Sequence, residues 1–110
     1  MRSPITTHVL DTALGRPAAG VAIRLLRLDG SELASGVTND DGRIADLLAP
    51  GALEAGTYRM TFATGPYFEA TGRPAFYPEV AVVFTIVEPR EHYHIPLLLS
   101  PFGYSTYRGS

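Results

Sequence analysis

The sequence predicts an all-β sandwich with one short helix. Short runs rich in β-branched and aromatic residues recur at spacings near 10 residues, and clusters of Gly, Pro, Asn and Asp separate them. This pattern gives seven or eight strands, as expected for two packed sheets. No linker, tandem repeat or low-complexity segment divides the 110 residues, so we expect a single domain spanning residues 1–110.

The elements follow from local composition. The expected strands are, in chain order, residues 5–10, 21–28, 31–38, 57–64, 80–87, 92–99 and 102–107. Asp29 and Gly30 predict a tight turn, and residues 39–42 (NDDG) predict another. Residues 65–74 predict one short helix around Phe68 that ends at Gly72. The run 80–87 is continuously apolar and β-branched, so it is expected to be a buried strand.

Composition excludes several kinds of chemistry. All nine basic residues are Arg and there is no Cys, which removes lysine Schiff bases, thiolate nucleophiles and disulfides. The net charge is −2 with no basic cluster, so neither nucleic acid nor a membrane surface is an expected partner. No apolar run approaches the roughly 20 residues of a membrane-spanning helix, and no secretory leader is recognisable. The expected compartment is therefore the cytoplasm.

The three histidines are the first candidates for chemistry. His92 and His94 project from the same face of their strand because side chains alternate, and Thr6, His8 and Leu10 share a face of the first strand. All three histidines can meet if these two strands pair. Histidine suits acid–base catalysis near neutral pH, but a three-histidine zinc site has the same spacing. Histidines that are merely solvated on a strand surface remain a third interpretation.

Arginine and the last four residues are the second set of candidates. Arg43 follows the 39–42 turn and either solvates that turn or presents a fork of donors to a planar, anionic substrate. Arg108 has the same two interpretations. Residues 107–110 would ordinarily be a frayed end, yet Tyr107, Arg108 and Ser110 place an aromatic ring, a guanidinium and a hydroxyl close together.

The whole chain resembles the transthyretin-like 5-hydroxyisourate hydrolases. The segments that carry the resemblance are residues 5–11 (ITTHVLD), 15–20 (GRPAAG), 38–43 (TNDDGR), 76–80 (FYPEV) and 92–110 (HYHIPLLLSPFGYSTYRGS). The pattern of Asp11, Gly15, Pro17 and Gly20 with a later Asp-Gly turn occurs in many β-sandwich proteins. The closing Tyr-Arg-Gly-Ser is specific, and it resembles the hydrolases rather than the hormone-carrying transthyretins.

The resemblance implies a transthyretin-like (prealbumin-like) β-sandwich of two four-stranded sheets with one short helix. It implies a homotetramer, a dimer of dimers, with active sites in a channel between the dimers. No cofactor or metal is expected. Carried over to this chain, the catalytic residues are His8, Arg43, His94 and Ser110. The substrate-binding residues are His92, Tyr107 and Arg108.

The implied reaction opens the N1–C6 amide ring of a small-molecule substrate, 5-hydroxyisourate, during purine breakdown. We hypothesise that His94, with His8, activates a water molecule while Arg43 stabilises the developing oxyanion. Three alternative functions remain: a carrier that holds an apolar ligand in the channel, a zinc hydrolase, and a structural adaptor. The carrier predicts apolar walls with few convergent polar groups.

Overall fold

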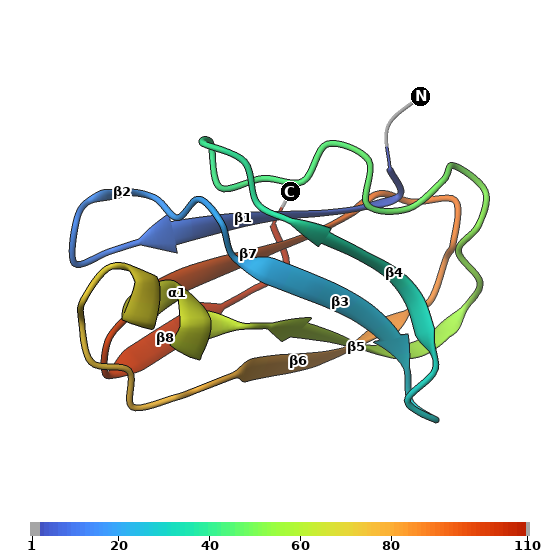
Figure 1. The fold of residues 1–110 in the computed structure, drawn as a ribbon. Coiled ribbons are helices and arrows are strands. Elements are labelled where there is room, and N and C mark those ends of the chain that lie inside the picture. Colours follow the sequence, from blue (N-terminus) through green and yellow to red (C-terminus); the bar gives the residue numbers. More distant parts are fainter. Residues whose placement is uncertain (1–2, 110) are drawn as a thin grey trace.

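The computed structural model describes residues 3–109, in which eight strands and one helix form a two-layer sandwich (Figure 1). The elements in chain order are β1 (Ile5–Asp11), β2 (Arg16–Pro17), β3 (Ala22–Arg27), β4 (Glu32–Val37), β5 (Gly56–Phe62), α1 (Thr64–Ala70), β6 (Val80–Ile86), β7 (Tyr93–Ser100) and β8 (Gly103–Thr106). The predicted all-β fold with one short helix is confirmed.

The strands form two four-stranded sheets. One sheet has the order β2-β1-β7-β8 and the other has the order β4-β3-β5-β6. Strands β1 and β7 are parallel neighbours, although most of the chain separates them, while the other pairs are antiparallel. Figure 1 shows β1 (blue) and β7 (orange-red) side by side in one layer. This long-range pairing positions the candidate site.

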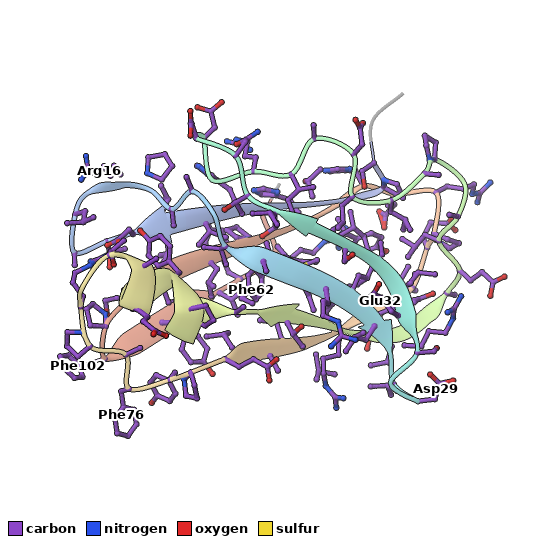
Figure 2. The ribbon with its side chains drawn as sticks, viewed as in Figure 1. Arg16, Asp29, Glu32, Phe62, Phe76 and Phe102 are labelled. Atoms are coloured by element: carbon purple, nitrogen blue, oxygen red, sulfur yellow. The ribbon has the colours of Figure 1, made fainter. Side chains whose placement is uncertain are left out.

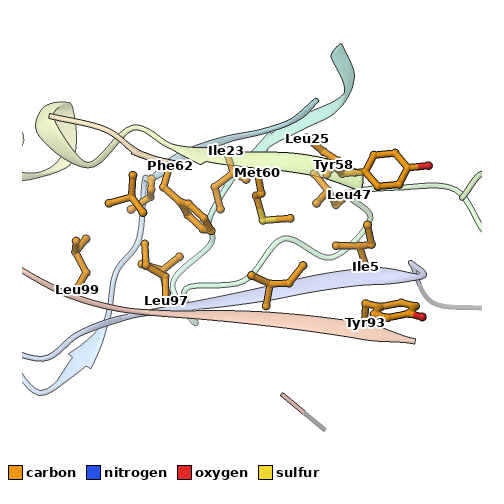
Figure 3. Packing of buried hydrophobic residues seen from close by; sticks show 14 of the residues in the cluster. Ile5, Ile23, Leu25, Leu47, Tyr58, Met60, Phe62, Tyr93, Leu97 and Leu99 are labelled. Carbon is orange, nitrogen blue, oxygen red and sulfur yellow. The ribbon is translucent and has the colours of Figure 1, made fainter. Parts of the chain in front are cut away.

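The core fills the space between the sheets, where both sheets turn apolar side chains inward (Figure 3). Strand β1 buries every second residue from Ile5 to Asp11. Fully buried large side chains come from both sheets and the helix: Ile5, Val9, Val21, Ile23, Leu25, Met60, Phe62, Phe68, Val80, Ile86, Leu97 and Leu99. The outward faces of β1 and β7 carry Thr6, His8 and His94 near one end and Leu10 and Leu98 near the other.

The helix is joined to the end of β1 by a buried carboxylate. Asp11 accepts a hydrogen bond from the Tyr67 hydroxyl at 2.7 Å and an ion-paired hydrogen bond from Arg73, which follows the helix. It also accepts the backbone N–H groups of Ala13 and Leu14 at 3.1 Å. These donors satisfy a charge that would otherwise be costly to bury.

Three details of the predicted elements are wrong. The run 80–87 was expected to be a buried strand, but β6 is an edge strand on which Ala81, Val83 and Thr85 are exposed, because no strand pairs with its outer side within residues 3–109. Strand β2 was not expected, because two residues that include Pro17 carry no strand pattern; it exists because Leu10 and Asp11 offer it a backbone edge. Thr64 was expected to end a strand, but it begins the helix, with its hydroxyl donating to the Tyr77 carbonyl at 2.8 Å. No helix in the described part of the chain has the length and apolarity needed to cross a membrane.

Candidate active site

The parallel pairing of β1 with β7 brings the histidines together. Its register places Thr6 opposite His94 and His8 opposite Pro96. The side chains of Thr6, His8 and His94 are half-buried and alternate with the core residues of their strands. They therefore share the outward face, which we call the histidine face. The pairing that the sequence required for the histidines to meet is confirmed.

A single hydroxyl connects two of the imidazoles. Thr6 Oγ1 lies 2.8 Å from His94 Nδ1 and 2.9 Å from His92 Nε2. His92 immediately precedes β7. It therefore lies toward the start of β1 from Thr6, whereas His8 lies toward the end of β1. The three histidines thus belong to one cluster that is ordered around the first strand.

A tight turn places Arg43 along the edge of β1 that is opposite to β7. The Asn39 side-chain oxygen accepts the backbone N–H groups of Asp41 at 2.9 Å and Arg43 at 3.1 Å, and an isolated β-bridge joins Arg43 to His8. Gly42 has φ +73°, and a Cβ there would lie 2.3 Å from the Val9 carbonyl oxygen. Only glycine permits this approach, which sets Arg43 beside His8.

The end of the described chain returns to His94. An isolated β-bridge pairs Gly109 with His94, and the Gly109 N–H donates to the His94 carbonyl at 2.8 Å. This bridge keeps the register of the β7–β8 pair, so Tyr107 lies across from Pro96, the residue that faces His8. The tail therefore runs along the site, while Ser110 falls outside the described residues.

Arg108 has contacts away from the histidine face. Its guanidinium carbon lies 4.3 Å from the centroid of the Tyr93 ring, and its Nη2 lies 3.9 Å from Glu91 Oε1. Tyr93 is an inward residue of β7, so this contact lies at the open edge between the two sheets. There the side chain helps to line a cavity of about 270 Å³ between β6, β7 and β8. Its predicted place in the substrate site stays a prediction.

The histidine face favours neutral imidazoles. Burial lowers the pKa of His94 below 6.5, and the nearby charges of Arg43, His8 and His92 lower it further. Burial and then Arg43 also lower the pKa of His8, although Asp41 opposes this shift. A neutral imidazole can accept a proton, and a guanidinium beside it can stabilise a developing anion. The arrangement therefore fits general base catalysis on a carbonyl compound.

A metal centre is less well matched to this geometry. Within residues 3–109, no group of three or more His, Cys, Asp or Glu side chains is arranged to hold a metal ion. One nitrogen of His92 and one of His94 lie within hydrogen-bond distance of the Thr6 hydroxyl, so an ion could use these two nitrogens only if that contact were broken.

Two site residues were missed from the sequence alone. Thr6 was placed on the correct face but given no role, because alternation shows direction and not the partner across the sheet. Gly109 was noticed only as part of the tail, yet it lies against the His94 ring. A tail residue without a side chain carries no local signal for such a contact.

Comparison with known proteins identifies the family of the chain. Residues 5–109 match the model of the HIUase/Transthyretin family. A mouse protein named 5-hydroxyisourate hydrolase is 50% identical, with 98% of this chain and 96% of that protein covered. A protein of the same name from Mesorhizobium japonicum is 53% identical, with 96% of this chain and 91% of that protein covered.

Solved structures share the fold. The 5-hydroxyisourate hydrolase of Klebsiella pneumoniae superposes with a TM-score of 0.85 at 43% identity, covering 96% of this chain and 92% of that one. Sea bream transthyretin in complex with thyroxine gives a TM-score of 0.89 at 36% identity, covering 96% and 94%. The sandwich is thus common to a hydrolase and a thyroxine-binding protein, and this chain belongs to the HIUase/Transthyretin family.

Proposed function

We propose that this chain hydrolyses 5-hydroxyisourate at its N1–C6 amide, which yields 2-oxo-4-hydroxy-4-carboxy-5-ureidoimidazoline in urate breakdown. The observation that carries the proposal is the histidine face, where His8 and His94, both with a lowered pKa, lie beside Arg43. Relatives that are about half identical over nearly their whole length bear the name of this enzyme.

The chemistry needs a base, an anion-stabilising group and a water molecule. The imidazole of His94 takes a proton from water as the oxygen attacks C6, and the guanidinium of Arg43 stabilises the oxyanion that forms. The C6–N1 bond then breaks, and N1 leaves with a proton returned by an imidazole of the cluster. That proton is the one His94 took from water, and His8 can relay it by accepting it from the His94 imidazolium and passing it to N1. His8 is near enough because the β1–β7 register sets it opposite Pro96, two residues from His94, and its charge acts on His94.

The tail completes the proposed site. The backbone of Tyr107 lies on the β8 side of Pro96, and Tyr107 also lines the cavity that Arg108 lines. We propose that its hydroxyl and ring orient a planar substrate at this edge of the site. Ser110 and Arg108 complete the segment that we propose for substrate positioning, with Ser110 next to the Gly109–His94 bridge in the chain. Arg108 would have to leave Tyr93 to reach the histidine face.

A carrier function is the alternative, because the thyroxine-bound transthyretin superposes at least as well as the hydrolase. The fold therefore does not distinguish a hydrolase from a carrier, and the distinction depends on the side chains of the site. An apolar ligand would gain little from two imidazoles, a guanidinium and a hydroxyl that converge on one surface. This polar set favours the hydrolase.

Assembly into a homotetramer, a dimer of dimers, is part of the proposal, as is a cytoplasmic location. Strands β6 and β8 are the open edges on one side of the sandwich and offer unpaired backbone groups to another chain (Figure 1). Phe76 and Phe102, 68% and 69% exposed, project at one end of the same side, whereas Phe62 lies between the sheets (Figure 2). An exposed aromatic surface beside open strand edges is typical of a subunit interface.

The decisive experiment follows the absorbance of freshly prepared 5-hydroxyisourate with the purified protein. We expect rapid decay for the wild type, a rate near the uncatalysed one for His94→Ala, and a large loss when residues 107–110 are deleted. Circular dichroism shows whether each variant is folded. Thyroxine binding without any acceleration of hydrolysis would replace the hydrolase proposal with the carrier.

A further inference from the structure

We propose that Thr6 is a positioning residue whose hydroxyl selects the tautomer of His94 and ties that choice to His92. The inference deepens the proposed hydrolase function and rests on it for its kinetic part. Its structural part, the position of a proton on each imidazole, can be tested whether or not the protein is a hydrolase.

The geometry makes Thr6 the common partner of both rings. Its Oγ1 lies within hydrogen-bond distance of His94 Nδ1 (2.8 Å) and of His92 Nε2 (2.9 Å). A threonine side chain has few χ1 rotamers because its Cβ is branched, so the hydroxyl oxygen is held in place before any substrate binds. The in-register pairing of Thr6 with His94 fixes the backbone beneath it as well.

The hydroxyl has one proton for two imidazole nitrogens. It can donate to one ring only, so the other ring must donate its own N–H to the hydroxyl oxygen. Two arrangements satisfy both contacts. Either His92 donates to Thr6 and Thr6 donates to His94, or His94 donates to Thr6 and Thr6 donates to His92. The two tautomers are therefore linked through one oxygen.

The proposed chemistry selects the second arrangement. His94 Nδ1 faces Thr6, so Nε2 is the ring nitrogen left to accept a proton from water. It accepts one only if the neutral ring carries its hydrogen on Nδ1. His94 then donates Nδ1–H to Thr6 Oγ1, Thr6 donates to His92 Nε2, and neutral His92 carries its hydrogen on its own Nδ1.

The hydroxyl performs the orienting role that a carboxylate performs in a Ser-His-Asp triad. A carboxylate both fixes the tautomer and stabilises the imidazolium by its charge. A neutral hydroxyl fixes the tautomer and adds no negative charge, so the imidazole is oriented while its basicity stays modest. During water attack Nε2 gains a proton and the Nδ1–H···Oγ1 bond persists, so only the proton from water is transferred.

The kinetic test uses Thr6→Val, which keeps the branched shape and removes the hydroxyl. We expect kcat to fall about 10- to 100-fold, a part of the roughly 10²–10⁴-fold value of general base catalysis, with KM nearly unchanged. Thr6→Ser restores the hydroxyl and should recover most of the lost rate. Thr57→Val is the matched control, because it removes an exposed hydroxyl bonded to Thr85 in the other sheet. A kcat for Thr6→Val equal to that of the control overturns the positioning role.

The structural test is the ¹⁵N spectrum of the imidazoles above pH 7. In the wild type we expect His94 to show a protonated Nδ1 and an unprotonated Nε2, and Thr6→Val to lose this preference. A wild-type His94 protonated on Nε2 would overturn the tautomer assignment even if Thr6→Val were slow or failed to fold. If the wild type has the expected spectrum but no hydrolase activity, the proposed function fails while the Thr6 arrangement stands.

Discussion

Gly109 lies directly against the imidazole of His94. A Cβ built on Gly109 would be 2.5 Å from His94 Cδ2 and 3.2 Å from Cγ, well inside van der Waals contact. Its backbone N–H meanwhile donates to the His94 carbonyl, so the tail cannot move away without losing that bond. The absence of a side chain at Gly109 thus allows the His94 ring to occupy this position.

Gly109→Ala should therefore displace the His94 ring or detach the tail, and either change should reduce kcat by about 10-fold or more, because a misplacement of 1 Å can cost 10²-fold. The melting temperature should change little, since the contact lies near the chain end. Gly103→Ala is the control: a Cβ there would meet only Ser100 Oγ at 3.7 Å. Equal rates for both variants would show that the contact does not position His94.

The acid limb of the pH–rate profile should lie below pH 6.5. Burial and Arg43 lower the pKa of both His8 and His94, so the neutral base persists to lower pH and activity is lost only as pH falls through the lowered pKa. Histidine titration by NMR gives the same midpoints without turnover. Arg43→Gln should move them upward, whereas Arg24→Gln, which alters an exposed pair with Glu32, should leave them in place. Midpoints at or above 6.5 in the wild type would contradict this prediction.

The Asp11 cluster should control acid stability. Burial alone would raise the pKa of Asp11, but hydrogen bonds from Arg73 and Tyr67 more than offset it, and the pKa lies below 3.8. The carboxylate therefore stabilises the fold above pH 3.8, and this contribution is lost as pH falls through the lowered pKa. Asp11→Asn should destabilise the protein by about 3 kcal/mol at pH 7, because Arg73 loses its partner.

Urea unfolding at several pH values measures this effect. As the pH falls, the free energy of unfolding should decrease less for Asp11→Asn than for the wild type, because the variant has no carboxylate at position 11 to protonate. Glu88→Gln, which alters an ion pair with the highly exposed Arg90, should cause no measurable change. Equal stabilities for the two variants would mean that the buried ion pair is not a stabilising element.

Assembly should depend on the β6 edge and not on the opposite edge of the same sheet. Val83 on β6 and Val37 on β4 are similarly exposed, at 54% and 59%. A lysine on an edge strand disfavours pairing with another chain, so Val83→Lys should yield smaller particles in light scattering and lower activity. Val37→Lys should remain the size of the wild type. A change of size with Val37→Lys alone would place the interface at the β4 edge instead.

Local sequence patterns were sufficient to predict several features of the site and of the fold. Alternation places Thr6 and His8 on one face of β1, and residues 39–42 form the expected turn before Arg43. The one expected helix is present around Phe68. These features depend on neighbours a few residues apart, which a sequence displays directly.

By itself, the sequence determined the sandwich, the family and which face of each strand carries a histidine. Only the tertiary structure decided that Thr6 bridges His92 and His94, that Gly109 lies against the His94 ring, and that Arg108 packs on Tyr93. The physical reason is that side-chain direction follows from backbone geometry within one strand. The partner of a side chain depends on pairing between strands that lie almost ninety residues apart, such as Thr6 and His94.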